Sequence, residues 1–437
     1  MHSAPPLGAL LLLFASAAFA QQPAAQPAPQ PGQQPDSLVL TRARAVQLAL
    51  ARNPQLEVAR EQTAQFRAIR VQAVAIPDPA VTTSLDQENG FFRSAPTGQR
   101  NVGAILTLPF PDKIRLRGRV ATADVANSNS AYYALRYQVA AQTAAMYDSL
   151  LLASRQRADL LQGQELSQQF LQRTQARFNA GTVPRLDVIR ATVDVAQAVN
   201  QLIANERDIA AARAGLNRLI GRPVAAPIGA GDSLDVPPPL PPAESVAAIA
   251  AVSRPELAGL RAEREGARAA TSLAHEFWLP DITLGVNRDV APGGPPSAFS
   301  TGLAFPVPFL FWQHTRGEIA QAQHRERELA ASYRDLSAQI AQDVRNAYAT
   351  ANTSLRQAIF IRDELLPSAR EAFRAASASY AIGGSSAFEV IDARRTLLDA
   401  ESQYSAALAA ANTARSDLER ATGAPITTTA SGDIHAQ

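Results

Sequence analysis

The sequence predicts a mainly α-helical protein with a small β part, in which one structural unit occurs twice. Segments of similar sequence recur about 202 positions apart, as residues 216–223 do at 418–425. Within each copy the spacing of apolar residues changes from about 3.6 to about 2 and back, which indicates helix, then strand, then helix. Each copy also holds one very long helical stretch, 112–178 or 313–379. A period this long exceeds that of solenoid repeats and indicates a duplicated architectural unit.

The chain begins with a segment that resembles an export signal. An apolar run from Leu7 to Phe14 precedes a small-x-small site that ends at Ala20. The residues after it are mostly Gln, Pro and Ala, a composition that cannot form a core. We predict a signal peptide over 1–20, a disordered Pro/Gln tail over 21–36, a first repeat over 37–223, a Pro-rich linker over 224–243, a second repeat over 244–425 and a C-terminal tail over 426–437.

The composition excludes several classes of function. The chain has no cysteine, so it has no disulfide, no thiolate metal site and no lipid anchor attached through cysteine. Its 41 basic and 39 acidic residues nearly balance, which gives no indication of nucleic-acid binding. Beyond the signal peptide no stretch approaches the roughly 20 apolar residues of a membrane helix. If the protein enters a membrane, we expect it to do so as β-strands.

Each repeat opens with two helices that a proline separates. We expect helices over 41–52 and 54–75 in the first copy, and over 244–253 and 255–277 in the second. Asn53 and Arg254 each precede a proline, and proline disfavours the helical conformation in the residue before it. The break between the two helices is therefore predicted at the same place in both copies.

Two β-hairpins follow these helices, at about 80–108 and about 281–306. In both segments apolar residues alternate with polar or small ones, which is the period of a half-exposed strand. Each strand should hold about 9–10 residues, the length of a tilted membrane-spanning strand. An amphipathic hairpin on a soluble core fits the same pattern, and the alternation alone does not separate the two.

A long antiparallel helical hairpin completes each repeat, over 112–219 and over 313–421. The outgoing helix of each hairpin, over 112–178 or 313–379, would extend roughly 100 Å at 1.5 Å per residue. In the second copy apolar residues keep the 3/4 spacing of a coiled-coil seam. Pro367 should kink the outgoing helix near its far end. The returning helices should stop at Gly221 and Gly423, because glycine readily takes the left-handed conformation at a helix C-terminus.

This order of elements resembles that of the TolC-like outer-membrane efflux protein family, the outer membrane factors. The similarity is most specific in Phe178-x-x-Gly181-Thr182, followed by 186–191, and in Tyr380-x-x-Gly383, followed by 388–393. In the family these segments form the periplasmic tips of the helical hairpins. Residues 108–117 and 305–311 are similar to the CzcC-like heavy-metal branch of the family.

The resemblance implies a homotrimer in the outer membrane of a Gram-negative bacterium, with a long periplasmic part. Four strands per chain cannot close a membrane barrel, which needs at least eight. Three chains would supply a 12-stranded transmembrane β-barrel in contact with outer membrane lipid, continued by a trimeric α-barrel of twelve helices. The expected function is a passive exit duct for heavy metals or drugs. It would work with a periplasmic adaptor (membrane fusion protein) and an RND-type inner-membrane pump.

By this resemblance, Glu389, Asp392 and Tyr380 would form the periplasmic gate. Three chains would place six carboxylates from the acidic pair around one constriction, and such a ring attracts cations. Tyr380 would tie neighbouring helices together there. A local role is an alternative for Glu389, since Ser386-x-x-Glu389 is also a capping box.

Two further groups of residues complete the expected site. The hairpin tips, which we expect to dock an adaptor, include Gly181, Thr182, Asp187, Gly383 and Gly384. For the glycines, the alternative to docking is a purely structural role, because glycine permits the tight turn. We predict a belt of aromatic residues at the membrane interface, formed by Trp278, Phe309, Phe311 and Trp312. Core packing beneath the hairpin is the alternative for these.

A function of another class stays open at this point. A periplasmic coiled-coil adaptor or scaffold would have no membrane barrel, but a single helical hairpin flanked by a lipoyl-like domain would be expected of it. The sequence has no nucleophile elbow, P-loop or dinucleotide glycine motif. We therefore expect no catalytic residues, no cofactor and no metal site.

Overall fold

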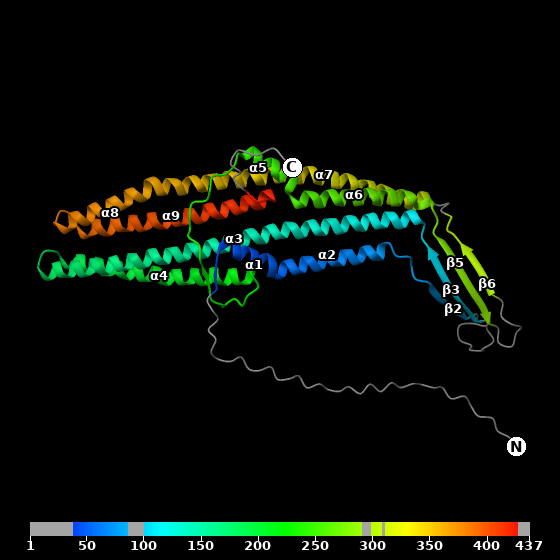
Figure 1. The fold of residues 1–437 in the computed structure, drawn as a ribbon, viewed down its shortest axis with the longest axis horizontal. Helices are drawn as coiled ribbons and strands as arrows, with labels where there is room; N and C mark the ends of the chain where they lie inside the picture. Colours follow the sequence, from blue (N-terminus) through cyan, green and yellow to red (C-terminus); the bar gives the residue numbers. More distant parts are fainter. Residues whose placement is uncertain (1–37, 86–99, 291–298, 308–310, 427–437) are drawn as a thin grey trace, which may run out of the picture. The chain divides into compact units, whose positions relative to one another are not determined.

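The computed structural model describes residues 38–85, 100–290, 299–307 and 311–426, and every structural statement below concerns these ranges. The chain is mainly helical, as predicted, with few strands. The first copy contains β1 (Leu38–Leu40), α1 (Arg42–Arg52), α2 (Pro54–Ala73), β2 (Ala80–Leu85), β3 (Arg100–Leu108), α3 (Pro111–Asn179) and α4 (Arg185–Leu219). The second contains β4 (Ile228–Ala230), α5 (Ala243–Ser253), α6 (Pro255–His275), the 3₁₀ turn η1 (Glu276–Trp278), β5 (Ile282–Val290), β6 (Phe299–Ala304), α7 (Phe311–Phe360), the π-helical turn η2 (Ile361–Leu365), α8 (Leu366–Ala381) and α9 (Ala387–Thr422). The two copies share one order of elements (Figure 1).

The opening helices of both copies are fixed by the residue before a proline. Asn53 caps α2 by accepting a hydrogen bond from the amide of Gln55 at 2.9 Å, and its own amide group donates to the carbonyl of Leu219 at 2.9 Å. In the second copy Arg254 donates from Nη1 to the carbonyl of Arg420 at 3.0 Å. In each copy this residue therefore ties the start of the unit to the end of its returning helix.

Each copy also has its own hydrophobic core near this junction. One core includes Tyr147, Leu216 and Ile220, and the other includes Val344 and Leu418. Complete burial of a side chain such as Leu stabilises the fold by about 1.5–3 kcal/mol. Because the two cores are separate, each unit stabilises its own junction.

The four strands of the two hairpins form a single antiparallel sheet in the order β2-β3-β5-β6. The central pair, β3 and β5, joins the two copies, with Ala104 opposite Val286. Within the described residues β2 and β6 hold six residues each, ending at Leu85 and beginning at Phe299 where the described ranges stop, and β3 and β5 hold nine, as predicted. Among the described strands, β2 and β6 have no partner on their outer sides.

One face of this sheet is apolar and is not covered by the rest of the described chain. This face is largely apolar: the register places Val81, Ala104, Val286 and Thr301 in one row across the strands, and Leu284 and Leu303 share a second row. Val81 is 79 % exposed and Leu303 is 64 % exposed. The opposite face carries small or polar residues such as Thr82, Gly103, Asn287 and Ser300. An uncovered apolar surface of this kind marks an interaction site.

Two features of the fold were missed by the sequence analysis. β1 and β4 form a small parallel sheet, so part of the predicted linker 224–243 is a strand. The second long helix is not a plain α-helix with a kink at Pro367, because a π-helical turn interrupts it just before that residue. Proline lacks an amide hydrogen and its ring collides with the carbonyl four residues earlier, and a π turn relieves both effects.

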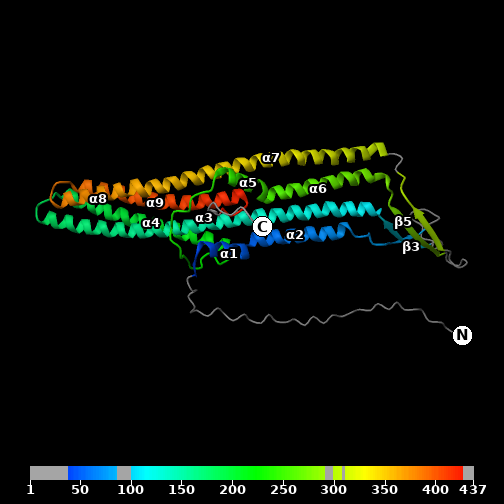
Figure 2. The ribbon, with the colours of Figure 1, turned by 45° about the horizontal axis from the view of Figure 1, so that its top comes forward.

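Helix α3 connects the four-stranded sheet to the tip of the first helical hairpin. Only two residues separate the end of β3 from the start of this helix, and the helix ends at the turn that leads to α4. The sheet and the tip therefore lie at its opposite ends. Figures 1 and 2 show α4 alongside α3 and α9 alongside α8, with all four helices reaching the same end. No helix in the described ranges combines the length and the apolar character needed to cross a bilayer.

The glycines that follow the first pair of long helices provide a test of this local geometry. Gly181 and Gly221 both have positive φ, 74° and 68°. A Cβ at Gly221 would lie 2.7 Å from the carbonyl oxygen of Arg52, whereas one at Gly181 would meet nothing within 4 Å. We expect Gly181→Ala to cost about 1 kcal/mol of unfolding free energy from backbone strain. Gly221→Ala should cost about 1 kcal/mol more from steric overlap.

Denaturant unfolding, monitored by circular dichroism, gives the unfolding free energy of both glycine variants. Gly181→Ala is the control, because it shares the backbone strain and lacks the overlap. Equal destabilisation by the two substitutions would contradict the close approach of Gly221 to α1.

Candidate functional site

The two helical hairpins turn through the same kind of tight loop. Gly181 and Gly383 have φ values of 74° and 83°, which glycine adopts without strain. The next residue of each loop donates its amide hydrogen back to the last helical turn, from Thr182 to Arg177 and from Gly384 to Ser379, both at 2.9 Å. The structural role proposed for these glycines therefore agrees with the geometry of both tips.

Tyr380 lies where the two hairpins meet. Its side chain is buried, and its ring packs against Phe170 of α3 with the centroids 5.3 Å apart. The guanidinium of Arg177 lies 4.5 Å from the centre of the ring, and its Nη1 donates to the carbonyl of Tyr380 at 2.7 Å. The Tyr380 hydroxyl lies 3.4 Å from the hydroxyl of Thr174. Tyr380 thus joins α8 of the second copy to α3 of the first.

Glu389 and Asp392 are exposed on the first turns of α9. The amide of Glu389 donates to Oγ of Ser386 at 3.3 Å, and this hydroxyl lies 3.3 Å from the Glu389 carboxylate. The capping interaction is therefore present, and it leaves both carboxylates accessible to solvent. Neither acid forms an ion pair with another described residue. The pair can add negative charge to the tip while Ser386 caps the helix and contacts the Glu389 carboxylate.

The residues expected at the docking surface divide into two groups. Gly181, Thr182, Gly383 and Gly384 are exposed. Asp187 is only 9 % exposed, which removes it from an exposed docking surface of this chain. The sequence did not reveal this, because Asp187 lies on the buried face of α4 and an acid at a helix start is usually exposed.

Large apolar side chains also reach the surface at the tips. Ile382 is 87 % exposed, and the ring of Phe388 is exposed beneath the guanidinium of Arg190, 5.8 Å away. These residues adjoin the exposed glycines of the second loop, so the tip presents both apolar groups and backbone to a partner.

The structure describes only part of the predicted aromatic belt. Trp278 lies in η1 and is 61 % exposed, which favours an interface over core packing for this residue. Phe309 lies outside the described residues. Phe311 and Trp312 fall in the first turn of α7, and their side chains also lie outside the described part of the chain.

A buried ion pair near the tip was missed by the sequence analysis. Arg394 of α9 pairs with Asp194 of α4, and both side chains are buried. Arg394 also donates to Oγ of Ser167 and to the carbonyl of Gly163, both on α3. Burial lowers the pKa of Arg394 from its ordinary value, and Asp194 acts in the opposite direction. The pair therefore fastens three helices at one point.

The sequence held one signal for this pair. Asp194 lies between Ala191 and Ala198 on the apolar face of α4, where an acid requires a buried partner. That partner lies 200 residues further along the chain, and no local pattern identifies it.

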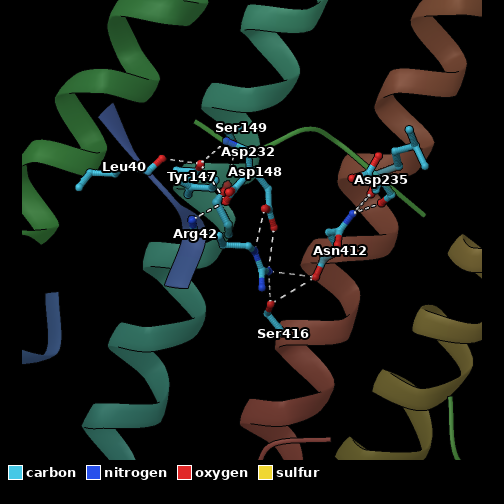
Figure 3. Close-up of polar contacts among 11 residues, drawn as sticks. Leu40, Arg42, Tyr147, Asp148, Ser149, Asp232, Asp235, Asn412 and Ser416 are labelled. Carbon is cyan, nitrogen blue, oxygen red and sulfur yellow. Dashed lines mark hydrogen bonds and ion pairs between the residues drawn. The ribbon is translucent and has the colours of Figure 1, made fainter. Parts of the chain in front are cut away.

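A second polar cluster, also missed, joins the two copies further along α3 and α9 (Figure 3). Arg42 of α1 makes a two-point contact with Asp148 of α3, at 2.9 and 3.0 Å, and donates to Oγ of Ser416 of α9 at 2.5 Å. The hydroxyl of Tyr147 donates to the carbonyl of Leu40 at 2.7 Å. Burial raises the pKa of Asp148, and Arg42 opposes this rise. Burial also raises the pKa of Tyr147 to about 12.

This arrangement places paired helical hairpins at one end of α3 and a sheet with an exposed, largely apolar face at the other, which is a fold found in solved outer membrane channels. Solved structures agree. The chain resembles the CmeC outer membrane channel of Campylobacter jejuni with a TM-score of 0.75 and 16% identity, over 92% of each chain. It resembles the open state of the MtrE outer membrane channel of Neisseria gonorrhoeae with a TM-score of 0.72 and 20% identity, over 88% of this chain and 89% of that one.

Comparisons of sequence assign the family. A model of the family described as "Outer membrane efflux protein" matches residues 45–222 and 246–424, one range in each copy, and the chain belongs to this family. It is 25% identical to the cobalt-zinc-cadmium resistance protein CzcC of Cupriavidus metallidurans over 387 residues, which span 88% of this chain and 90% of that protein. The protein is thus an outer-membrane protein of a Gram-negative bacterium, in a family of efflux channels and not of enzymes. Among the described residues, no three His, Cys, Asp or Glu side chains are placed to hold a metal ion.

Proposed function

We propose that the chain is the outer-membrane exit duct of a tripartite efflux system. In this proposal a periplasmic adaptor docks on the hairpin tips, and an inner-membrane pump supplies the energy. The duct itself is passive, since the sequence holds no nucleotide-binding motif.

The observation that carries the proposal is the four-stranded sheet with an uncovered apolar face and two open edges. An apolar face suits contact with lipid, and the opposite face of small and polar residues suits a water-filled interior. Open edges are not tolerated in lipid, because unpaired backbone groups there cost several kcal/mol each. Further copies of the chain must therefore close the sheet, and three copies would give a barrel of twelve strands.

The tips support the other half of the proposal. Three copies would bring six exposed carboxylates, from Glu389 and Asp392, around one entrance. Such a ring concentrates cations and repels anions. Together with the similarity to CzcC, a cobalt-zinc-cadmium resistance protein, the ring favours divalent metal cations as the substrate class.

Membrane fractionation and gel migration test the assembly. We expect the protein in the outer-membrane fraction, and we expect unheated samples to migrate at about three times the monomer mass. Heating should convert this species to monomer, because the barrel dissociates only on unfolding. A monomer or dimer in the soluble periplasmic fraction would contradict the duct and favour a scaffold.

A further inference from the structure

A cavity of about 360 Å³ lies near the tip between α3, α8 and α9, beside Tyr380 and Arg394. Its walls are largely apolar, formed by Leu166, Phe170, Phe373, Tyr380, Val390 and Ile391. The volume lies within the range of small-molecule sites, roughly 300–1,000 Å³. An apolar group of one or two rings fits such walls.

The charged residues that line the cavity all carry the same sign. They are Arg173, Arg177 and Arg394, and no Asp or Glu lines it. The charge of Arg394 is offset by Asp194. Arg177 uses one of its donors on the carbonyl of Tyr380, and Arg173 is exposed and forms no ion pair within the described ranges. Two uncompensated positive charges therefore border the apolar wall.

The third arginine of the lining, Arg394, is deeply buried. Arg394 is only 5 % exposed, and its Nε is buried with no hydrogen-bond partner among the described residues. Because its charge is paired with Asp194, an anion in the cavity would meet the guanidinium groups of Arg173 and Arg177 first.

We propose that this cavity binds a small amphipathic anion, with an aromatic or branched apolar body and one carboxylate or sulfonate. The body would lie against Phe170 and Phe373, and the anionic group would accept hydrogen bonds from the arginines. Charge-assisted hydrogen bonds of this kind are about twice as strong as neutral ones. Because α3 belongs to the first copy and α8 and α9 to the second, the bound ligand holds the two hairpins together. The cavity is therefore an effector site of the tip.

Isothermal titration calorimetry of the full-length protein in amphipol tests this proposal, with naphthalene-1-sulfonate as the probe. The neutral naphthalene-1-sulfonamide, of nearly the same shape, is the matched comparison. We expect one sulfonate per chain and an affinity at least roughly ten-fold higher than that of the sulfonamide. Equal affinity for the two compounds, or no heat of binding, would overturn the proposal.

Substitutions locate the binding within the chain. Ser377→Trp fills the cavity and should abolish binding, whereas Ala378→Trp places the same side chain on the next, exposed residue and should leave binding unchanged. Arg173→Gln removes an exposed charge without disturbing the core and should weaken binding of the sulfonate, not of the sulfonamide. Equal binding by both tryptophan variants would place the ligand elsewhere and refute the site.

Discussion

Replacing Glu389 and Asp392 by Ala should raise the single-channel conductance of the reconstituted protein and lower its preference for cations. The shorter side chains widen the entrance, and the loss of up to six charges from a trimeric ring removes the field that concentrates cations. Clefts lined by one sign of charge raise the local counter-ion concentration by roughly ten-fold or more, so the cation preference should fall by roughly that factor.

The isosteric pair Glu389→Gln with Asp392→Asn separates the two effects. These amides keep the size of the side chains, so the cation preference should fall with little change in conductance. Glu206→Gln with Asp208→Asn is the matched control, because it removes two exposed acids far along α4 from the tip. Unchanged selectivity in the tip variants would contradict the gate role and leave the Glu389 carboxylate with only its contact to the capping residue Ser386.

Asp194→Ala should destabilise the protein by about 3–5 kcal/mol, because it leaves the guanidinium of Arg394 buried without its counter-ion. The double variant Asp194→Leu with Arg394→Met should recover most of this loss, since apolar residues often replace a buried ion pair at little cost. Denaturant unfolding at fixed protein concentration gives both values; the concentration matters because assembly contributes to the measured stability.

Arg395→Met is the control for this pair, because it removes an exposed guanidinium from the next residue of the same helix. It should change the unfolding free energy by no more than about 1 kcal/mol. A loss below about 1 kcal/mol in Asp194→Ala would show that the pair does not fasten the three helices. An equal loss in the single and double variants would show that the loss does not come from an unpaired guanidinium at Arg394.

The sequence predicted those parts of the fold that local pattern determines. Asn53-Pro54 marked the helix break, alternation marked both hairpins, and Gly181 and Gly383 marked the turns. Strand β1 was not predicted, because three residues show no periodicity and its partner lies about 190 residues away. The π turn was not predicted either, because it depends on how the helix adapts to Pro367.

The candidate site was predicted in part, for a related reason. The exposed acids of α9 and the position of Tyr380 followed from the tip motif. Asp194 and Arg394 did not, because a buried ion pair between distant helices leaves only a polar residue on an apolar face. The burial of Asp187 was not predicted either, because it depends on how α4 packs and not on the residues next to Asp187 in the sequence.

The central claim is that β6 of one chain pairs with β2 of the next and closes a ring of three. The chain contains no cysteine, so introduced cysteines report this pairing without background. Thr83→Cys on β2 is combined in turn with cysteine at Ser300, Thr301 or Gly302 on β6. Three positions are used because a single chain does not define which residues of β2 and β6 lie opposite each other between chains. Thr83→Cys with Val102→Cys is the control, since these residues are opposite each other within one chain.

Oxidation of the purified protein, followed by denaturing gel migration, is the most direct test. We expect covalent dimers and trimers, and nothing larger, for at least one of the three β2–β6 pairs, while the control stays at the size of the monomer. Cross-links that extend beyond the trimer, or none between chains for any of the three pairs, would contradict a closed trimeric barrel.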